Sequence, residues 1–347
     1  MRRLLELTLV LASAALQACG DGDTRPRALD VGDLEVVHRW PRRYISMVAS
    51  SPDGAVFVSF DSSLWRGRGR RWERIAATID PGGRGWPLRM YAPSRRTLFA
   101  VGGPFVYRWD EGRGLRVEST PVDTQSVSCY DFGSGERLEA VWGRGPDDVY
   151  AVGHHGLIVH WDGRAWRLEP NPLRARAPSL CWEAFSTDLR AVGGTDGEVF
   201  AAGGSVLRRT RRGWVEVPRP VVGPDTGFVY AVAGTGRGVW FGGHGYRPIP
   251  GVPHGTSGGW LLRDWRGRWR AWSLYERGIG EIHGGSAHAG GPAVFWGYSH
   301  QVVAVHGHRV RLYSLRGLRV RGAVPVGQDV YVAAIVGDTS IIARLPR

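Results

Sequence analysis

The sequence predicts an all-β protein in which four-stranded units close into a ring, and two observations support this. Glycine, proline and tryptophan are abundant, with 51, 21 and 16 residues among 347, and few runs favour helices, which is typical of strands joined by many turns. A β-favouring pentamer also recurs at intervals of about 35 to 55 residues, a period found in ring-forming repeats. The seven copies begin at Val56, Leu98, Val149, Val199, Val239, Val294 and Val330.

Each repeat is expected to contain four antiparallel strands. The pentamer is the second strand, and a run rich in small residues precedes most copies, as at 138–143, 189–194 and 229–234. After the first six pentamers come a third apolar run, a turn and usually a tryptophan that opens the outer strand. Small residues fit the crowded axis of a propeller, and aromatic side chains fill the widening space between blades. The expected outer-strand tryptophans are Trp72, Trp166, Trp214 and Trp269.

The two ends of the chain are predicted to share the seventh blade. The last repeat supplies only three strands, 319–326, 329–336 and 340–347, whereas the run 34–40 precedes the first blade without a partner. A lone four-stranded sheet exposes two apolar faces, so neighbouring blades must stack and the ring must close. We therefore expect one domain over 33–347, a seven-bladed β-propeller of four-stranded antiparallel blades, closed by an N-terminal strand completing the last blade.

The motif "VWGRGPDDVYAVG" at 141–153, followed by "HWDGRAW" at 160–166, carries a resemblance to known proteins. It resembles the β-propeller lipoproteins and secreted proteins common in myxobacteria, whose repeats are WD40-like, and the resemblance covers 34–347. The resemblance implies a propeller fold but no particular activity, since propellers host unrelated functions. Glycine doublets also resemble kelch repeats, with a shorter spacing to the tryptophan, and lie at 102–103, 203–204 and 242–243.

The N-terminus predicts export. Residues 1–18 combine a basic start with an apolar stretch too short to span a bilayer, which is typical of a cleaved signal peptide. The sequence "LQAC" that ends at Cys19 resembles the bacterial lipobox. This resemblance implies a diacylglyceryl thioether and an amine-linked acyl chain on Cys19, which together anchor a protein firmly. An ordinary signal peptide with a chance cysteine is the alternative. Residues 19–32 then form the lipidated cysteine and a flexible tether.

The expected location is the cell envelope, with the protein lipid-anchored in the outer membrane and facing either the periplasm or the cell surface. Gly20 favours this address, because an aspartate in that position retains lipoproteins at the inner membrane in well-studied systems. The net charge is +13, and every basic residue other than histidine is an arginine. This positive charge suits anionic partners such as lipid head groups. Nucleic acid is not expected as a partner, because the arginines are scattered over many turns.

A candidate binding surface lies on the face that carries the longest connections. These are the linkers 119–137 and 171–188 and the insert 243–258 between the middle strands of blade five. Long connections inside a regular repeat are commonly functional, although they could also merely cover the channel. The candidate binding residues are Tyr130, Asp131, His154, His155, Trp182, Glu183, Tyr246, Arg247 and His254.

Two classes of function stay open. The first is a non-catalytic binding or scaffold module for an envelope protein or glycan, with the propeller as a monomer. The second is an envelope carbohydrate-active enzyme, a glycan hydrolase, lyase or oxidase. No nucleophile elbow, phosphate loop or zinc signature is present, so we expect no catalytic residue and no cofactor.

No metal site is expected either. Neighbouring side chains such as His154 and His155 diverge in a turn, and His306 and His308 lie in a turn of the opposite face. Neither pair has a third ligand at metal-like spacing, so both are expected to be ordinary exposed turn residues. His244 and His254 in the blade-five insert are the remaining pair that folding could bring together.

Cys129 and Cys181 occupy nearly equivalent positions in the linkers before blades three and four. Because exported proteins meet an oxidising compartment, we predict a Cys129–Cys181 disulfide, with two free buried thiols as the alternative. Thiol counting on the mature, denatured and unreduced protein should find no reactive thiol when Cys19 is acylated. Two reactive thiols would contradict the disulfide.

Overall fold

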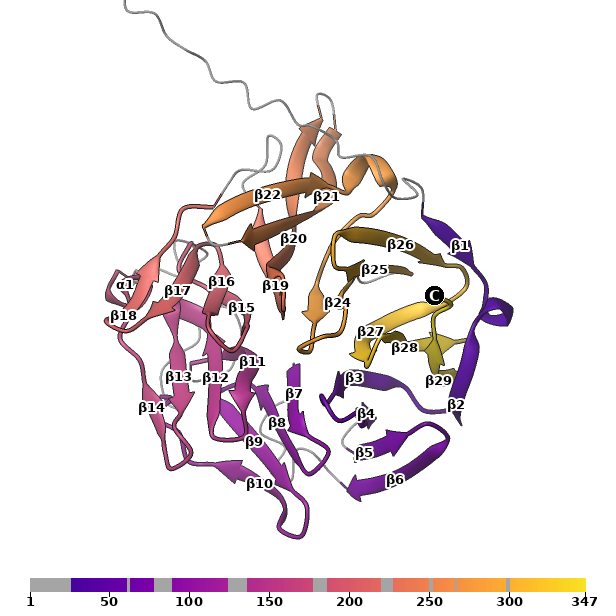
Figure 1. The fold of residues 1–347 in the computed structure, drawn as a ribbon, viewed down its shortest axis with the longest axis horizontal. Coiled ribbons are helices and arrows are strands. Elements are labelled where there is room, and N and C mark those ends of the chain that lie inside the picture. The colour runs from indigo at the N-terminus through magenta and orange to yellow at the C-terminus, as the bar shows by residue number, and fades with distance from the viewer. Residues whose placement is uncertain are drawn as a thin grey trace, which may run out of the picture.

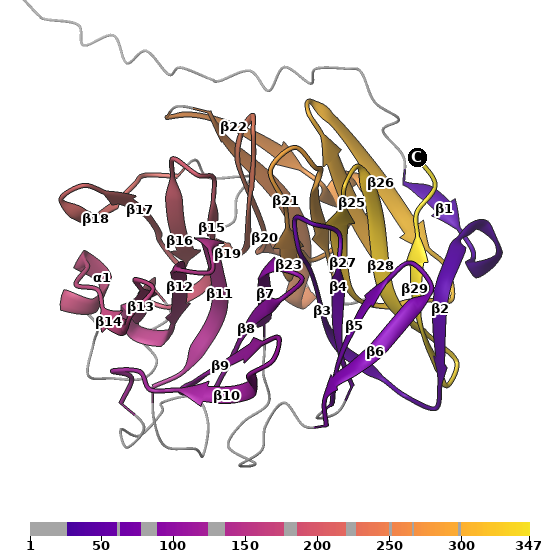
Figure 2. The same ribbon diagram turned by 60° about the horizontal axis from the view of Figure 1, so that its bottom comes forward.

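The computed structural model describes residues 26–60, 63–77, 89–123, 136–176, 186–219, 227–249, 252–265, 267–297 and 300–347. Their strands form seven sheets arranged around a central axis, each built of four antiparallel strands, and one sheet carries an additional edge strand (Figure 1). The prediction of a seven-bladed β-propeller is therefore confirmed. Figure 2 shows that the sheets are inclined relative to one another around the ring.

The first four blades each run from an inner to an outer strand in chain order. Blade one consists of β3 (Ile45–Ser50), β4 (Val56–Phe60), β5 (Ser63–Arg68) and β6 (Arg71–Ala76). Blade two consists of β7 (Arg89–Ser94), β8 (Thr97–Gly102), β9 (Phe105–Asp110) and β10 (Gly114–Glu118). Blade three consists of β11 (Leu138–Gly145), β12 (Asp148–Gly153), β13 (Ile158–Trp161) and β14 (Trp166–Leu168). Blade four consists of β15 (Leu189–Gly194), β16 (Val199–Gly203), β17 (Val206–Thr210) and β18 (Gly213–Glu216).

The last three blades include both ends of the described chain. Blade five consists of β19 (Phe228–Thr235), β20 (Gly238–Ile249), β21 (Val252–Trp265) and β22 (Arg268–Ser273). Blade six consists of β23 (Gly284–Ser286), β24 (Ala293–Trp296), β25 (Gln301–His306) and β26 (Arg309–Leu315). Blade seven consists of β27 (Arg319–Val326), β28 (Asp329–Val336), β29 (Thr339–Arg344) and β2 (Glu35–Pro41). Short helical turns lie at Val31–Asp33, His154–Gly156, Pro172–Ala175 and Tyr275–Arg277.

Small residues in the inner strands allow the blades to meet at the axis, as predicted. A Cβ atom on Gly234 in β19 would overlap the carbonyl oxygen of Gly194 in β15 of the neighbouring blade. The outer-strand tryptophans fill the wider spaces further out, and Trp214, for example, is 5% exposed in a cluster that joins blades three and four. The radial gradient from small to aromatic side chains therefore matches the wedge between adjacent sheets.

The predicted closure of the ring is confirmed. Strand β2 pairs antiparallel with β29, so that Arg39 lies opposite Ile341. Trp40 in β2 is 6% exposed and packs in a cluster that joins blades seven and one. Its ring centroid lies 4.9 Å from that of Phe60 and 4.7 Å from that of Trp72, both in blade one. The closing strand thus supplies hydrogen bonds to its own blade and an aromatic contact to the next.

One strand was not predicted. β1 (Arg27–Leu29) pairs in parallel with β26 and adds a fifth strand to blade six (Figure 1). These residues fall inside the segment expected to be a flexible tether. The physical reason for the difference is Leu29, which is 2% exposed and packs with Leu315 and Leu318. A single buried leucine gives no periodic pattern, so the sequence offered no signal for this strand.

The blade-five insert also differs from expectation. Residues 243–258, expected as a long connection, continue β20 and β21 into an extended hairpin in which Tyr246 pairs with Ser257. The two arms satisfy each other's backbone hydrogen bonds, which a structureless connection of that length would leave to water. The segment therefore projects as a paired ribbon from the face that carries the long linkers.

Residues 1–25, which include the expected signal peptide and Cys19, lie outside the described residues, as do Cys129 and Cys181. Lipidation and the disulfide therefore stay predictions. Within the part of the chain that the structure describes, no helix has the length and apolar character of a membrane span.

Replacing Trp40 with alanine should lower the free energy of unfolding by about 3–5 kcal/mol, because a nearly buried aromatic side chain at the ring closure is lost. Denaturant unfolding measures the change. The neighbouring Arg39→Ala variant, whose side chain is exposed, should stay within about 0.5 kcal/mol of the wild type. Equal effects of the two substitutions would contradict a stabilising closure.

Candidate functional site

The seven inner strands surround a central channel with a cavity of about 270 Å³. Its lining is mostly small and apolar in the middle and charged at the ends. Arg89, Arg190 and Arg321 lie where the inner strands begin, and Arg144 and Asp196 lie where they end. Arginines from several blades therefore converge on one channel, which makes its lining basic.

Five inner strands carry an extra residue near their start. The pairing register of each inner strand with its second strand shifts by one residue there, which is a β-bulge. Bulges bend a strand and turn the extra side chain in a new direction. The extra residues are Ser46, Glu139, Arg190, Tyr230 and Arg321.

All of these except Glu139 line the central channel. We call the end of the channel that Ser46, Arg89, Arg190, Tyr230 and Arg321 line the channel mouth, and Glu139 lies beside it. The linkers into the inner strands and the connections between the middle strands lie on the same side of the ring, as expected. The backbone amide of His154, for example, donates to the carbonyl of Arg137 in the linker into β11.

A mostly buried carboxylate organises one side of the channel mouth. An Oε1 atom of Glu139 lies 3.0 Å from Nε2 of His154, 3.1 Å from Nε of Arg137 and 3.6 Å from Nη1 of Arg190. Burial alone would raise the pKa of Glu139, but the hydrogen bond to His154 and the charge of Arg190 hold that pKa below its usual value. Arg190 also contacts the fully buried Asp188. This cluster is therefore a fixed network of paired charges.

The predicted binding residues His154 and His155 lie in different environments. His154 is 5% exposed and faces Glu139, so the expectation that it is an exposed turn residue is wrong. Its neighbour turns away as expected, because His155 adopts a φ of 54° and the ring centroids lie 6.3 Å apart. The backbone amide of His155 donates to Oδ1 of Asp188 at 3.0 Å, and burial lowers the pKa of its half-buried imidazole. The pair is held by the linkers of two blades.

The other predicted binding residues are placed only in part. Tyr130, Asp131, Trp182 and Glu183 lie outside the described residues. For Tyr246, Arg247 and His254 the structure gives the backbone register of the β20–β21 hairpin alone. Those three positions therefore lie on a ribbon beyond the channel mouth.

The hairpin register separates His254 from His244. Arg247 pairs with Thr256 and Ile249 with Val252, so His254 lies beside the tip of the hairpin. His244 pairs with Gly259, about four residues or roughly 13 Å further along the strand. The two histidines that seemed able to meet within the insert are thus held apart by the pairing.

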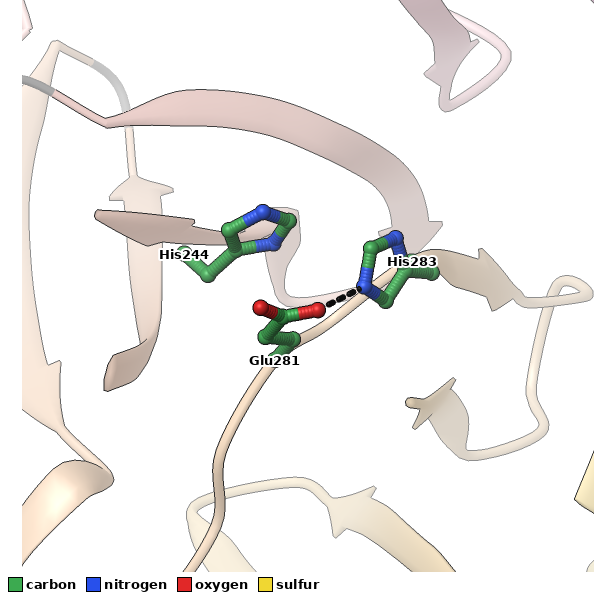
Figure 3. Close-up of side chains that lie close together, drawn as sticks. All are labelled: His244, Glu281 and His283. Carbon is green, nitrogen blue, oxygen red and sulfur yellow. Dashed lines mark hydrogen bonds and ion pairs between the residues drawn. The ribbon is translucent and has the colours of Figure 1, made fainter. Parts of the chain in front are cut away.

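Sequence reasoning missed a cluster that joins blades five and six, formed by His244, Glu281 and His283 (Figure 3). His244 ends the propeller part of β20, and the other two lie in the linker into β23. The Nε2 atom of His283 donates to Oε2 of Glu281 at 2.6 Å. Glu281 and His283 flank the buried Ile282, an alternation that an extended segment produces. That alternation was visible in the sequence, but the partner on another blade was not.

His288 lies at the other end of the channel lining and connects three blades. Its Nε2 atom lies 2.7 Å from Oγ of Ser50, whose hydroxyl donates to the carbonyl of Pro325 at 2.7 Å. The imidazole therefore donates to the serine oxygen. Burial of the imidazole lowers the pKa of His288 to about 4.

No protein-family model matches the sequence, and no curated protein matches it significantly. Solved structures share the fold. YCF48 from Cyanidioschyzon merolae is 13% identical, with a TM-score of 0.57 over 90% of this chain and 98% of that chain. YCF48 bound to D1 peptide is 12% identical, with a TM-score of 0.58 over 94% and 99%. The Pan2 WD40 domain of Neurospora crassa is 12% identical, with a TM-score of 0.53 over 93% and 98%. The chain thus has a WD40-like seven-bladed propeller fold.

Because His288 is neutral in the folded protein, the free energy of unfolding should fall as the pH falls. The folded protein holds the pKa of His288 near 4, below the ordinary value of 6.5, so the unfolded chain takes up the proton first. The contribution of His288 to the free energy of unfolding is fully present above pH 6.5 and is lost as the pH falls toward 4. In that window it changes the unfolding constant by about tenfold per pH unit.

Urea unfolding of the wild type and of His288→Gln measures this contribution as the difference between their pH slopes. The variant should lose stability less steeply between about pH 6.5 and pH 4.5. His308→Gln, which changes an exposed histidine in a turn on the opposite face, should keep the wild-type slope. Parallel slopes for His288→Gln and the wild type would show that His288 does not carry the effect.

Proposed function

We propose that this protein is a lipid-anchored scaffold of the cell envelope whose channel mouth binds a segment of a partner protein. The observation that carries the proposal is the convergence of Arg89, Arg190 and Arg321 from three blades on one end of the channel. Positive side chains around a concave, partly apolar opening suit a segment that brings carboxylates and an apolar stretch.

Arg321 is the residue best placed to meet such a ligand. It is exposed, and among the described residues it has no carboxylate within ion-pair distance. Its Nε atom donates to the carbonyl of Ile45 at 3.2 Å, which orients the guanidinium without neutralising it. Arg190, in contrast, is already paired with Asp188 and Glu139. Arg321 therefore offers charge to a partner, while Arg190 holds the mouth together.

The structural neighbours support a protein ligand. One of them is YCF48 in complex with the D1 peptide, and another is the WD40 domain of Pan2. A glycan is the other ligand class that the long-linker face was expected to take, and the test below distinguishes it. The envelope location and the acyl anchor on Cys19 belong to the proposal, and the sequence "LQAC" supports them.

The test is crosslinking and affinity capture from intact envelopes with the full-length lipidated protein. The wild type should capture a defined protein, and Arg321→Glu should reduce that capture at least about tenfold, since a charge reversal in a contact costs more than 1.4 kcal/mol. Arg212→Glu, in an exposed turn of the opposite face, is the matched control and should capture as the wild type does.

Two further results bear on the proposal. Equal capture by Arg321→Glu and the wild type would remove the channel mouth as the binding site, and a saccharide in place of a protein would favour the glycan ligand. The Cys19→Ser variant should move from the membrane fraction to the soluble fraction, because its acyl chains are lost. A variant that stays with the membrane would contradict the anchor while leaving the arginine comparison valid.

A further inference from the structure

The cluster of His244, Glu281 and His283 has the composition of a metal site. One ring nitrogen of each histidine and one carboxylate oxygen of the glutamate lie within 4.8 Å of one another. Two imidazoles and one carboxylate form a ligand set typical of Zn²⁺ and related transition-metal ions. Calcium and magnesium prefer oxygen ligands alone, so the two imidazole nitrogens argue against them.

The backbone holds the three residues in place. The amide of His283 donates to the carbonyl of Trp296 at 2.9 Å, and Nη2 of Arg89 donates to the carbonyl of His283 at 2.6 Å. Ile282, between the two linker ligands, is fully buried in the cluster of blades five and six. With its centre fixed in this way, the linker directs Glu281 and His283 to the same side (Figure 3).

The orientation of His244 is fixed from the other blade. Its ring stacks on that of Tyr230, with centroids 4.5 Å apart and planes 3° from parallel. Its centroid lies 4.6 Å from that of His283. Tyr230 is the extra residue of the β19 bulge, so the same bulge that shapes the channel mouth also positions this histidine.

The distances require only small side-chain movements to admit an ion. Ligand atoms about 2.0–2.2 Å from Zn²⁺ in tetrahedral geometry lie about 3.3 Å from one another. The hydrogen bond of 2.6 Å between His283 and Glu281 must therefore open by less than about 1 Å. The other ligand atoms, which lie within 4.8 Å of one another, must approach by at most about 1.5 Å. Burial lowers the pKa of both His244 and His283, which favours the neutral imidazoles that a metal needs.

We propose that His244, Glu281 and His283 bind one divalent transition-metal ion such as Zn²⁺. The ligands come from blades five and six, so the bound ion joins two blades beside the channel mouth. Three protein ligands leave one position of a tetrahedral shell for water or another small ligand. The side chain of His283 is 12% exposed and that of Glu281 36% exposed, so an ion can enter from solvent. This site stands independently of the partner-binding function.

The experiment uses the full mature chain in detergent, purified without a polyhistidine tag and stripped of metal by dialysis. Titration with Co²⁺ should give one equivalent of binding with visible d–d bands and no thiolate charge-transfer band. His244→Ala and His283→Gln should each weaken binding by at least about 100-fold, because each removes or displaces a ligand. The matched control is His308→Ala, which should bind as the wild type does.

Each other outcome overturns the proposal. A wild-type protein that binds no Co²⁺ or Zn²⁺ shows that the cluster is a packing and hydrogen-bond network only. Unchanged affinity in both ligand variants, or a thiolate band in the wild type, places the ion elsewhere in the chain. Near-ultraviolet circular dichroism on the metal-free variants confirms that loss of binding does not come from loss of fold.

Discussion

The pairing of β2 with β29 is the interaction on which the rest of the structure depends. It completes blade seven with a strand that lies about 300 residues away along the chain, and Trp40 then packs that blade against blade one. Without β2, the backbone edge of β29 would be unpaired, and the contact that Trp40 makes with blade one would be lost. Only a closed ring brings the seven inner strands to one axis, and only that convergence creates a channel with a mouth. Burial of the apolar clusters between each two neighbouring blades offsets the entropic cost of closing so long a loop.

The β-bulges explain how a repetitive fold supports a non-repetitive site. The same backbone irregularity occurs near the start of five inner strands, and it carries Ser46, Glu139, Arg190, Tyr230 and Arg321. Each bulge turns one side chain out of the regular alternation and leaves the core-facing residues of the strand undisturbed. The identity of that side chain is therefore free to differ between blades without a cost to packing. In this protein the position holds a negative charge in one blade, positive charges in two, an aromatic ring in one and a serine hydroxyl in one.

Much of the fold was predictable because the signals were repeated. The pentamers predicted the second strand of each blade, and the tryptophans predicted outer strands. The missing strand of the last repeat indicated that 34–40 completes the seventh blade. The site was less predictable for physical reasons. A bulge leaves no mark in a single sequence, so nothing distinguished Arg190 or Arg321 from other arginines. His154 looked like a turn residue because its partner Glu139 lies 15 positions away. His244 and Glu281 meet across two blades, a contact that depends on the wedge geometry and on no local pattern. β1 escaped prediction because three residues are too few for any periodicity.

The position of β1 has a mechanical consequence. The chain that arrives from the N-terminal segment first meets blade six, where Arg27–Leu29 run parallel to β26, and only then reaches the closing strand of blade seven. Tension applied upstream of Arg27 therefore loads the three-residue β1 and the buried Leu29 before it reaches β2. β1 can detach at the cost of a few hydrogen bonds and one leucine while the ring stays shut. A pull on the N-terminal segment would therefore detach β1 before it could separate β2 from β29.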